Sequence, residues 1–177
     1  MKKIMIVDDN YLSAEGIEKN IDWEALNAEI IHVCYNGTSA IEAMKKEPAD
    51  LIISDIEMPD LDGISMSRQA LEINPMVKII LISAYDKFEY ARRALLLGAL
   101  DYIEKPLDYT YLIQKVKNAF ALMEKEQKNL QLLKQSRPLL TEKFFREITH
   151  LPSSEAAYRL KPYLQYLNLE LNYDFYT

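Results

Sequence analysis

The five residues Leu51–Asp55 constrain the fold most, because they form an apolar run of β character that ends on a carboxylate. A strand that is buried on both faces has such an uninterrupted run. The next residues, Met58-Pro59-Asp60-Leu61-Asp62-Gly63, are typical of a turn. In open α/β sheets, ligands bind in the crevice beyond the carboxyl ends of the strands. Asp55 therefore either lines such a crevice or, as is common after strands, caps a turn or a helix.

Short apolar runs of this kind alternate with segments of helical spacing over the first 106 residues. Strands are predicted at residues 4–7, 29–35, 51–55, 77–83 and 100–103. Helices are predicted at residues 11–21, from a cap at Thr38 or Ser39 to just before Pro48, at 63–73, and at 86–97 ahead of Gly98. Five strands alternating with helices indicate a parallel sheet covered on both faces. With right-handed crossovers, the predicted fold class is α/β, a doubly wound five-stranded parallel sheet.

A long helical pattern begins at Asp108 and is expected to end near Ser136, because Pro138 should stop it. Leu130 and Leu133 lie past the compact domain and need a partner, which is either a two-stranded coiled coil or the C-terminal segment. The predicted organisation is an α/β domain at 1–122, a helical linker at 123–137, and a short helical segment at 138–177. That last segment has the character of a domain cut off in the middle, which indicates a fragment of a longer protein.

Composition narrows the function classes. The net charge is -6, so the sequence lacks the basic footprint of a nucleic-acid-binding chain. No apolar run reaches the roughly 18 residues that a transmembrane helix needs, so no membrane association is expected. The only cysteine, Cys34, cannot form an internal disulfide and lies in an apolar stretch, which favours an inert buried thiol and a cytoplasmic location.

Polar residues follow four of the five predicted strands. They are Asp8, Asp9, Asp55, Ser83 and Lys105. Three carboxylates in one crevice repel each other, so positive charge is needed there. Lys105 supplies one charge, and Mg²⁺ suits a site of carboxylates, a backbone carbonyl and water. An aspartate in such a site can attack phosphorus and become an aspartyl phosphate.

The metal, Lys105 and a hydroxyl such as Ser83 are the expected stabilisers of the phosphoryl oxygens. Each residue alone also has an ordinary structural explanation: a solvated cap pair for Asp8 and Asp9, a turn hydroxyl for Ser83, and a surface position for Lys105. Their joint appearance at successive strand ends favours the phosphoryl site.

These residues carry a resemblance to the receiver domain of two-component response regulators, which has a CheY/flavodoxin-like fold. The matching segments are Val7-Asp8-Asp9, Asp55 with Met58-Pro59 and Asp62-Gly63, Ser83-Ala84, and Tyr102-Ile103-Glu104-Lys105-Pro106. The resemblance implies that Asp55 accepts phosphate from a sensor histidine kinase and that Asp8, Asp9, Asp55 and the backbone carbonyl of Glu57 hold Mg²⁺. It also implies that Ser83 moves to the phosphoryl group and Tyr102 swings inward. The chain would then be a phosphoacceptor, not an enzyme with a separate substrate.

Further segments are similar to YesN-type regulators, in which a receiver is followed by a linker helix, a middle segment and an AraC-type DNA-binding part. They are Ile21-Asp22-Trp23-Glu24, residues 83–91 and Asp101-Tyr102. The resemblance places DNA binding in a C-terminal domain that is missing here. Dimerisation is expected through the linker helix or through the face of the fourth helix and fifth strand. The resemblance implies that Glu57 and Tyr85 adjust the rate of dephosphorylation. Packing on the fourth predicted helix is the alternative role for Tyr85.

Three other classes of function fit the sequence less well. A phosphorylation-independent binding module with the same fold is the main alternative, and the complete set of five polar residues argues against it. A Mg²⁺-dependent phosphohydrolase would place a second aspartate two residues after its nucleophile, where this chain has Glu57. A flavin or dinucleotide domain lacks support, because no glycine-rich loop follows the first strand.

Overall fold

The computed structural model describes residues 1–84 and 99–148, with side chains described up to residue 132. The chain divides into two compact units, Met1–Leu122 and Met123–Thr177. The predicted helix at 86–97 and the segment from 149 onward lie outside the described residues.

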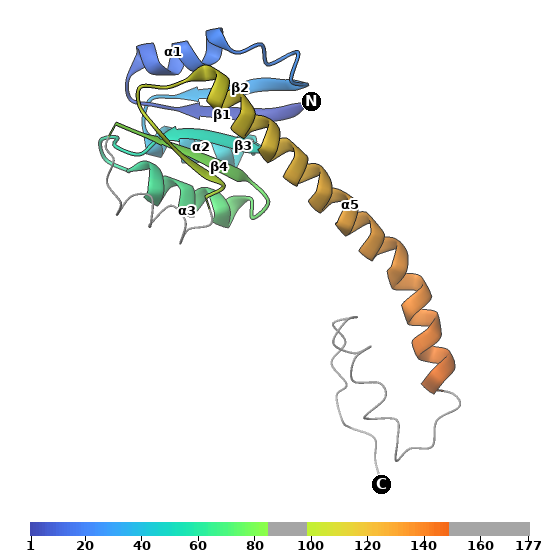
Figure 1. The fold of residues 1–177 in the computed structure, drawn as a ribbon. Helices are drawn as coiled ribbons and strands as arrows, with labels where there is room; N and C mark the ends of the chain where they lie inside the picture. The colour runs from blue at the N-terminus through green and yellow to red at the C-terminus, as the bar shows by residue number, and fades with distance from the viewer. Residues whose placement is uncertain (85–98, 149–177) are drawn as a thin grey trace. The chain divides into compact units, whose positions relative to one another are not determined.

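A five-stranded parallel sheet forms the centre of the first unit (Figure 1). Its strands are β1 (Lys2–Val7), β2 (Ala28–Cys34), β3 (Leu51–Asp55), β4 (Lys78–Ser83) and β5 (Asp101–Glu104), in the order β2-β1-β3-β4-β5. Every residue of β3 is buried, as its uninterrupted apolar run predicts. The order reverses direction between β1 and β3, so the crevice expected for ligands lies at the carboxyl ends of these two strands. The predicted fold class is confirmed.

Helices cover both faces of this sheet, as Figure 1 shows. They are α1 (Tyr11–Asn20), α2 (Gly37–Lys46), α3 (Gly63–Ile73) and α5 (Tyr109–Ile148). Buried residues of α2 and α3 share one core cluster with alternate residues of the strands, among them Met5, Ile52 and Leu81. Because strand side chains alternate between faces, Ile53 and Ile80 point to the opposite face, where α1 and the first turns of α5 lie.

Short polar side chains begin the described helices. Asn10 accepts hydrogen bonds from the backbone of α1, Asp62 from Ser65 in α3, and Asp108 from the first residues of α5. Helix α2 is capped by Asn36, whose side chain accepts from the Ser39 amide at 2.8 Å. The predicted cap at Thr38 or Ser39 is therefore wrong by two or three residues, since the asparagine before Gly37 is a preferred cap residue.

Helix α5 does not end near Ser136, as predicted, but continues through Pro138 to Ile148. Proline removes one backbone hydrogen bond and its ring crowds the preceding turn, at a cost of about 3 kcal/mol. The residues on both sides of Pro138 have good helix propensity, so the helix is interrupted locally without ending there. The segment at 123–137 is thus the middle of one 40-residue helix.

Gly63, the first residue of α3, permits a close approach of that helix to the end of β3. A Cβ atom placed on Gly63 would overlap the backbone carbonyl oxygen of Asp55, and neither backbone can move without disturbing the sheet. The Gly63 amide also donates to the Ile56 carbonyl at 2.9 Å. The glycine therefore holds α3 directly over the carboxylate-bearing strand end.

Gly63→Ala is expected to destabilise the protein by about 1–3 kcal/mol or more, the range for forcing extra atoms into a packed site. Urea unfolding followed by circular dichroism measures the change. Gly16→Ala is the matched control, because its added Cβ would meet only the hydroxyl end of the Tyr109 side chain, at 2.5 Å. Equal stability losses in the two variants would contradict the importance of the backbone contact.

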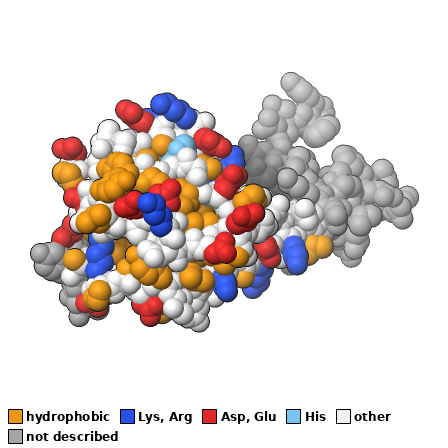
Figure 2. Space-filling view, turned by 90° about the horizontal axis from the view of Figure 1, so that it is seen from above, with side chains coloured by type: hydrophobic (Ala, Val, Ile, Leu, Met, Phe, Trp, Pro, Cys, Tyr) orange, Lys and Arg blue, Asp and Glu red, His pale blue; other side chains and the backbone are white. Residues whose placement is uncertain are grey.

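The described surface is mixed in character. In the view of Figure 2, acidic, basic and hydrophobic side chains are interspersed, and the coloured residues form no extended basic area. Among the described residues, no helix has both the length and the apolarity needed to cross a membrane. Cys34 is buried, and burial raises the pKa of its thiol, as expected of an inert cysteine.

Candidate metal site at the carboxyl edge of the sheet

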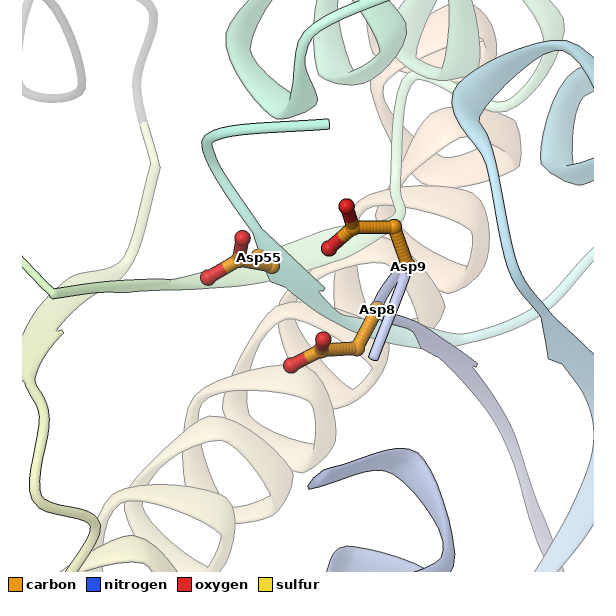
Figure 3. A group of neighbouring side chains, drawn as sticks. All are labelled: Asp8, Asp9 and Asp55. Carbon is orange, nitrogen blue, oxygen red and sulfur yellow. The ribbon is translucent and has the colours of Figure 1, made fainter. Parts of the chain in front are cut away.

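Three aspartates converge where β1 and β3 end (Figure 3). Asp8 and Asp9 directly follow β1, and Asp55 is the last residue of β3. Each offers a carboxylate oxygen that lies within 4.8 Å of those of the other two. Asp8 is 1% exposed and Asp55 is 6% exposed, whereas Asp9 is exposed. The residues predicted from three separate positions in the sequence therefore form one acidic cluster.

Lys105 brings positive charge to this cluster from the end of β5. Its Nζ lies 2.9 Å from Asp55 Oδ1 and 3.1 Å from Asp8 Oδ2. Its amide donates to the Ser83 carbonyl at 2.8 Å, which fixes the start of the β5–α5 connection to the end of β4. One ammonium group is thus shared between two buried carboxylates, and the carboxylate of Asp9 lies nearby with no ion pair to the residues that the structure describes.

The ion pair does not neutralise the site. Burial raises the pKa of the Asp55 carboxyl, Lys105 opposes this rise, and the negative charges of Asp8 and Asp9 add to it. Burial alone would lower the pKa of Lys105, but its contacts with Asp55 and Asp8 outweigh burial and raise it. Lys105 therefore stays charged, while ionised Asp55 remains disfavoured. A site with this balance gains from a second cation.

Asp8 is held in place by a residue that sequence analysis missed. Its Oδ1 accepts the backbone N–H of Asn10 at 2.9 Å, while its Oδ2 accepts from Lys105. Asn10 in turn caps α1 with its own side chain. The signal was present in the sequence, since an asparagine just before an apolar helical pattern is a typical helix start. The start of α1 and the orientation of Asp8 are thus coupled.

Ser83 and Tyr102 lie on β4 and β5, the two strands that follow β3 in the sheet. Ser83 ends β4 and is fully buried; it pairs in register with Glu104, the residue before Lys105. Tyr102 is half-buried on β5, pairs in register with Leu81, and packs against the core cluster. Ser83 therefore lies at the end of the strand next to Asp55, and Tyr102 lies one strand further along the sheet.

The structure describes the remaining predicted site residues only in part. Glu57 is exposed on the loop between β3 and α3, and its assignment as a backbone ligand stays a prediction. Leu130 is 46% exposed on α5. Leu133 belongs to the same helix, but its side chain lies outside the described residues, as does all of Tyr85.

A cleft of about 350 Å³ adjoins the cluster between α1 and the start of α5. Asp8 and Lys105 lie at its polar end, and Leu12, Ile17 and Leu107 line its apolar part. The cleft therefore borders the site on the side of Asp8 and Lys105.

The chemistry of the donor set fits a hard divalent cation. Three carboxylates offer oxygen ligands at one point, and hard cations such as Mg²⁺ prefer oxygen. Two of the carboxylates are buried beside a single ammonium, so the cluster lacks the positive charge to balance them. The fold and the site together define a class of protein: a doubly wound α/β domain with an aspartate–lysine site at the topological switch point of its sheet.

Comparison with known proteins places the chain within that class. Residues 4–117 match the family model of the response regulator receiver domain. The chain belongs to this family, the receiver domains of two-component response regulators, as the sequence motifs predicted.

Relatives of similar sequence are transcriptional regulators. The chain is 29% identical over 126 residues to YesN of Bacillus subtilis, a match covering 71% of this chain and 34% of that protein. It is 32% identical over 115 residues to DegU of Brevibacillus brevis, covering 65% of this chain and 48% of that protein. The chain thus spans less than half the length of these relatives.

Solved structures agree with the fold. The receiver domain of AraT from Geobacillus stearothermophilus is 34% identical, with a TM-score of 0.67 over 71% of this chain and 98% of that one. CheY of Borrelia burgdorferi, solved with CheX, BeF3 and Mg²⁺, is 28% identical, with a TM-score of 0.62 over 67% of this chain and 89% of that one.

Proposed function

We propose that this chain is a phosphorylation-dependent switch in which Asp55 accepts a phosphoryl group from a sensor histidine kinase, with Mg²⁺ bound beside it. The observation that carries the proposal is the position of the Asp55 carboxylate. It is buried at the switch point of the sheet, 2.9 Å from Lys105 Nζ and within 4.8 Å of oxygens of Asp8 and Asp9. Ligands of Mg²⁺ would be Asp8, Asp9, Asp55 and the backbone carbonyl of Glu57.

The reaction is a displacement at phosphorus. A carboxylate oxygen of Asp55 forms the new bond to phosphorus, the bond from phosphorus to the donor's histidine nitrogen breaks, and that nitrogen keeps the electron pair. Mg²⁺, when bound, offsets the charge of the carboxylates and phosphoryl oxygens. The Lys105 ammonium stabilises the same oxygens from the other side. Hydrolysis later returns Asp55 to a carboxylate and releases inorganic phosphate, so the chain takes part in its own dephosphorylation.

Two observations support a metal-dependent role. The Borrelia burgdorferi CheY named above has Mg²⁺ and BeF3 in its solved complex. In the present chain, ionised Asp55 is disfavoured by burial and by its acidic neighbours, so a cation would favour the nucleophilic form. We do not assign to the chain an enzyme activity that acts on a separate substrate.

Ser83 and Tyr102 would carry the signal away from Asp55. The Ser83 hydroxyl is proposed to bond the phosphoryl group, after which Tyr102 moves further inward. Tyr102 follows Asp101, which pairs with Lys115 of α5 at 2.6 Å, so movement on β5 has a direct connection to the long helix. Phosphorylation would thereby alter the surface of β5 and of the helix predicted at 86–97 and, through Asp101 and Lys115, the start of α5.

The downstream partner would be a second copy of the chain. Dimerisation is proposed through α5, which carries Leu133 and on which Leu130 is exposed, or through the face of β5 and the helix predicted at 86–97. DNA binding would belong to a further C-terminal domain, as suggested by the longer transcriptional regulators that the chain matches in part. A cytoplasmic location is proposed with this role.

The first experiment is an intact-mass measurement after incubation with acetyl phosphate and Mg²⁺. We expect the mass of one phosphoryl group to be gained, and no gain when EDTA removes the metal, because the carboxylates then repel the phosphoryl oxygens. Asp55→Asn is the control for the acceptor. A gain that persists in Asp55→Asn would place the phosphoryl group elsewhere.

If wild type gains no mass from acetyl phosphate, the purified histidine kinase domain is the next donor. Failure with both donors, together with no Mg²⁺ binding in calorimetry, would contradict the proposal and favour the phosphorylation-independent binding module.

A further inference from the structure

The loop between β3 and α3 carries Glu57 and has little freedom to move. At its start, the Ile56 amide donates to the Ile82 carbonyl at 2.9 Å; at its end, the Gly63 amide donates to the Ile56 carbonyl at 2.9 Å. Met58 is 8% exposed and belongs to the core cluster. The loop is thus anchored at both ends and in its middle.

A second segment of the chain limits this loop from outside. Gly37, the buried first residue of α2, faces Leu61. A Cβ atom on Gly37 would lie 2.9 Å from Leu61 Cβ, 3.1 Å from Leu61 Cγ, and closer still to the Leu61 backbone carbonyl oxygen. Because that oxygen is part of the backbone, no side-chain rotation relieves the overlap, and one of the two backbone segments must shift.

Space, not backbone conformation, makes glycine necessary at position 37. The φ angle of Gly37 is outside the left-handed region, so alanine could adopt the same backbone. The contact with Leu61 is what alanine could not accommodate. The loop also cannot retreat toward the sheet, because its other end already touches the Asp55 carbonyl at Gly63.

A displacement of Leu61 would therefore be absorbed by the residues just before it. Leu61 donates to the Pro59 carbonyl at 2.8 Å, and Asp60 has a φ of 66°, so residues 59–61 form a tight turn. Only Met58, whose side chain is held in the core, separates this turn from Glu57, so a shift of the turn strains the peptide that carries the Glu57 carbonyl.

We propose that Gly37 is a positioning residue of the magnesium site: by leaving room for the Leu61 backbone, it sets the position of the Glu57 carbonyl relative to the three carboxylates. This inference rests on the proposed function, because it requires Mg²⁺ at this site. Gly37 touches neither the metal nor the phosphoryl group and acts through Leu61.

The test is calorimetric titration of the full chain and of Gly37→Ala with Mg²⁺ and, separately, with Ca²⁺. Loss of support for a metal ligand typically weakens metal affinity by about 10–100-fold, and we expect such a loss for Mg²⁺. The loss for Ca²⁺ should be smaller, because Ca²⁺ accepts varied geometry while Mg²⁺ requires a near-ideal octahedron. A merely structural role would not change this ratio of affinities.

Two further variants keep the test decisive. Gly16→Ala adds a methyl group that meets only the end of the Tyr109 side chain, and its Mg²⁺ affinity should stay within about twofold of wild type. Leu61→Ala removes the side chain that lies against Gly37, and it serves if Gly37→Ala does not fold. Because that side chain packs the loop against the start of α2, its loss frees the loop, and we expect Leu61→Ala to lose Mg²⁺ affinity preferentially over Ca²⁺ affinity; unchanged affinities would overturn the role of this contact.

The outcomes separate this inference from the proposed function. If wild type binds no Mg²⁺, the proposed function fails and the inference fails with it. If wild type binds Mg²⁺ and Gly37→Ala binds it equally well, or loses Mg²⁺ and Ca²⁺ affinity in the same proportion, only the role of Gly37 is overturned. An equal loss in Gly16→Ala would overturn it as well.

Discussion

Asp55→Asn is expected to abolish phosphoryl incorporation and, in the absence of metal, to make the protein more stable than wild type. The first effect follows from removing the attacking oxygen. The second follows from the site itself, where Asp55 is 6% exposed and burial, together with Asp8 and Asp9, raises the pKa of its carboxyl. Asparagine removes the charge that the folded state disfavours.

The sign of the pH dependence follows from this raised pKa. Well below the ordinary aspartate pKa, Asp55 is protonated in both folded and unfolded chains, so the variant and wild type should be equally stable. As pH rises through the window between the unfolded and the raised folded pKa, the unfolded chain loses its proton first, and wild type loses stability. Above that window the advantage of Asp55→Asn is complete.

Thermal unfolding in EDTA at several pH values measures this difference. Relieving an unfavourable functional site typically adds about 0.5–2 kcal/mol, which corresponds to a few degrees for a domain of this size. Added Mg²⁺ should reverse the order, because it binds only the folded state and binds wild type better. Equal stability in EDTA at neutral pH would contradict the electrostatic account of the site.

The sheet and its polar edge were predictable because both depend on local patterns. Leu51–Asp55 reads as a buried strand from its composition alone, and the order of β-α units determines which strand ends meet. Asp8, Asp55 and Lys105 each had an ordinary explanation singly. The topology is what brings their charged atoms within ion-pair distance.

The positions that sequence analysis missed depend on contacts between distant segments. In the sequence, Gly37 and Gly63 look like ordinary turn and helix-start residues. Only the tertiary structure shows that the backbone of Leu61 lies close to Gly37 and the backbone of Asp55 lies close to Gly63. The role of Asn10 in orienting Asp8 depends on the same kind of proximity. A local sequence pattern indicates that a glycine or a cap residue is present, but it does not indicate which residues of distant segments contact it.

The error at Pro138 has a different cause. A proline was taken to end the helix, yet α5 continues to Ile148. The local penalty of about 3 kcal/mol is real, but helix formation is cooperative and segments on both sides favour it. Local propensity is thus outweighed where the flanking sequence is long and helical.

Lys105→Met is expected to lower the rate of phosphoryl incorporation about 10²–10³-fold, the usual loss when one preorganised charge or donor is removed from a transition state. Methionine keeps the approximate length of the side chain and removes the ammonium that lies 2.9 Å from Asp55 Oδ1 and 3.1 Å from Asp8 Oδ2. Single-turnover mass spectrometry with acetyl phosphate at saturating Mg²⁺ measures the rate.

Binding of Mg²⁺ distinguishes this chemical role from damage to the site. The Lys105 ammonium competes with a cation for oxygens of Asp8 and Asp55, so its removal should leave Mg²⁺ affinity unchanged or make it tighter. The metal-free variant should also be less stable, because breaking a buried ion pair leaves uncompensated charge. Lys105→Arg, the matched control, keeps the charge in a wider planar group and should retain part of the rate. A Lys105→Met variant that binds Mg²⁺ and reacts at the wild-type rate would show that the ammonium only balances the resting site, leaving the metal to stabilise the phosphoryl oxygens.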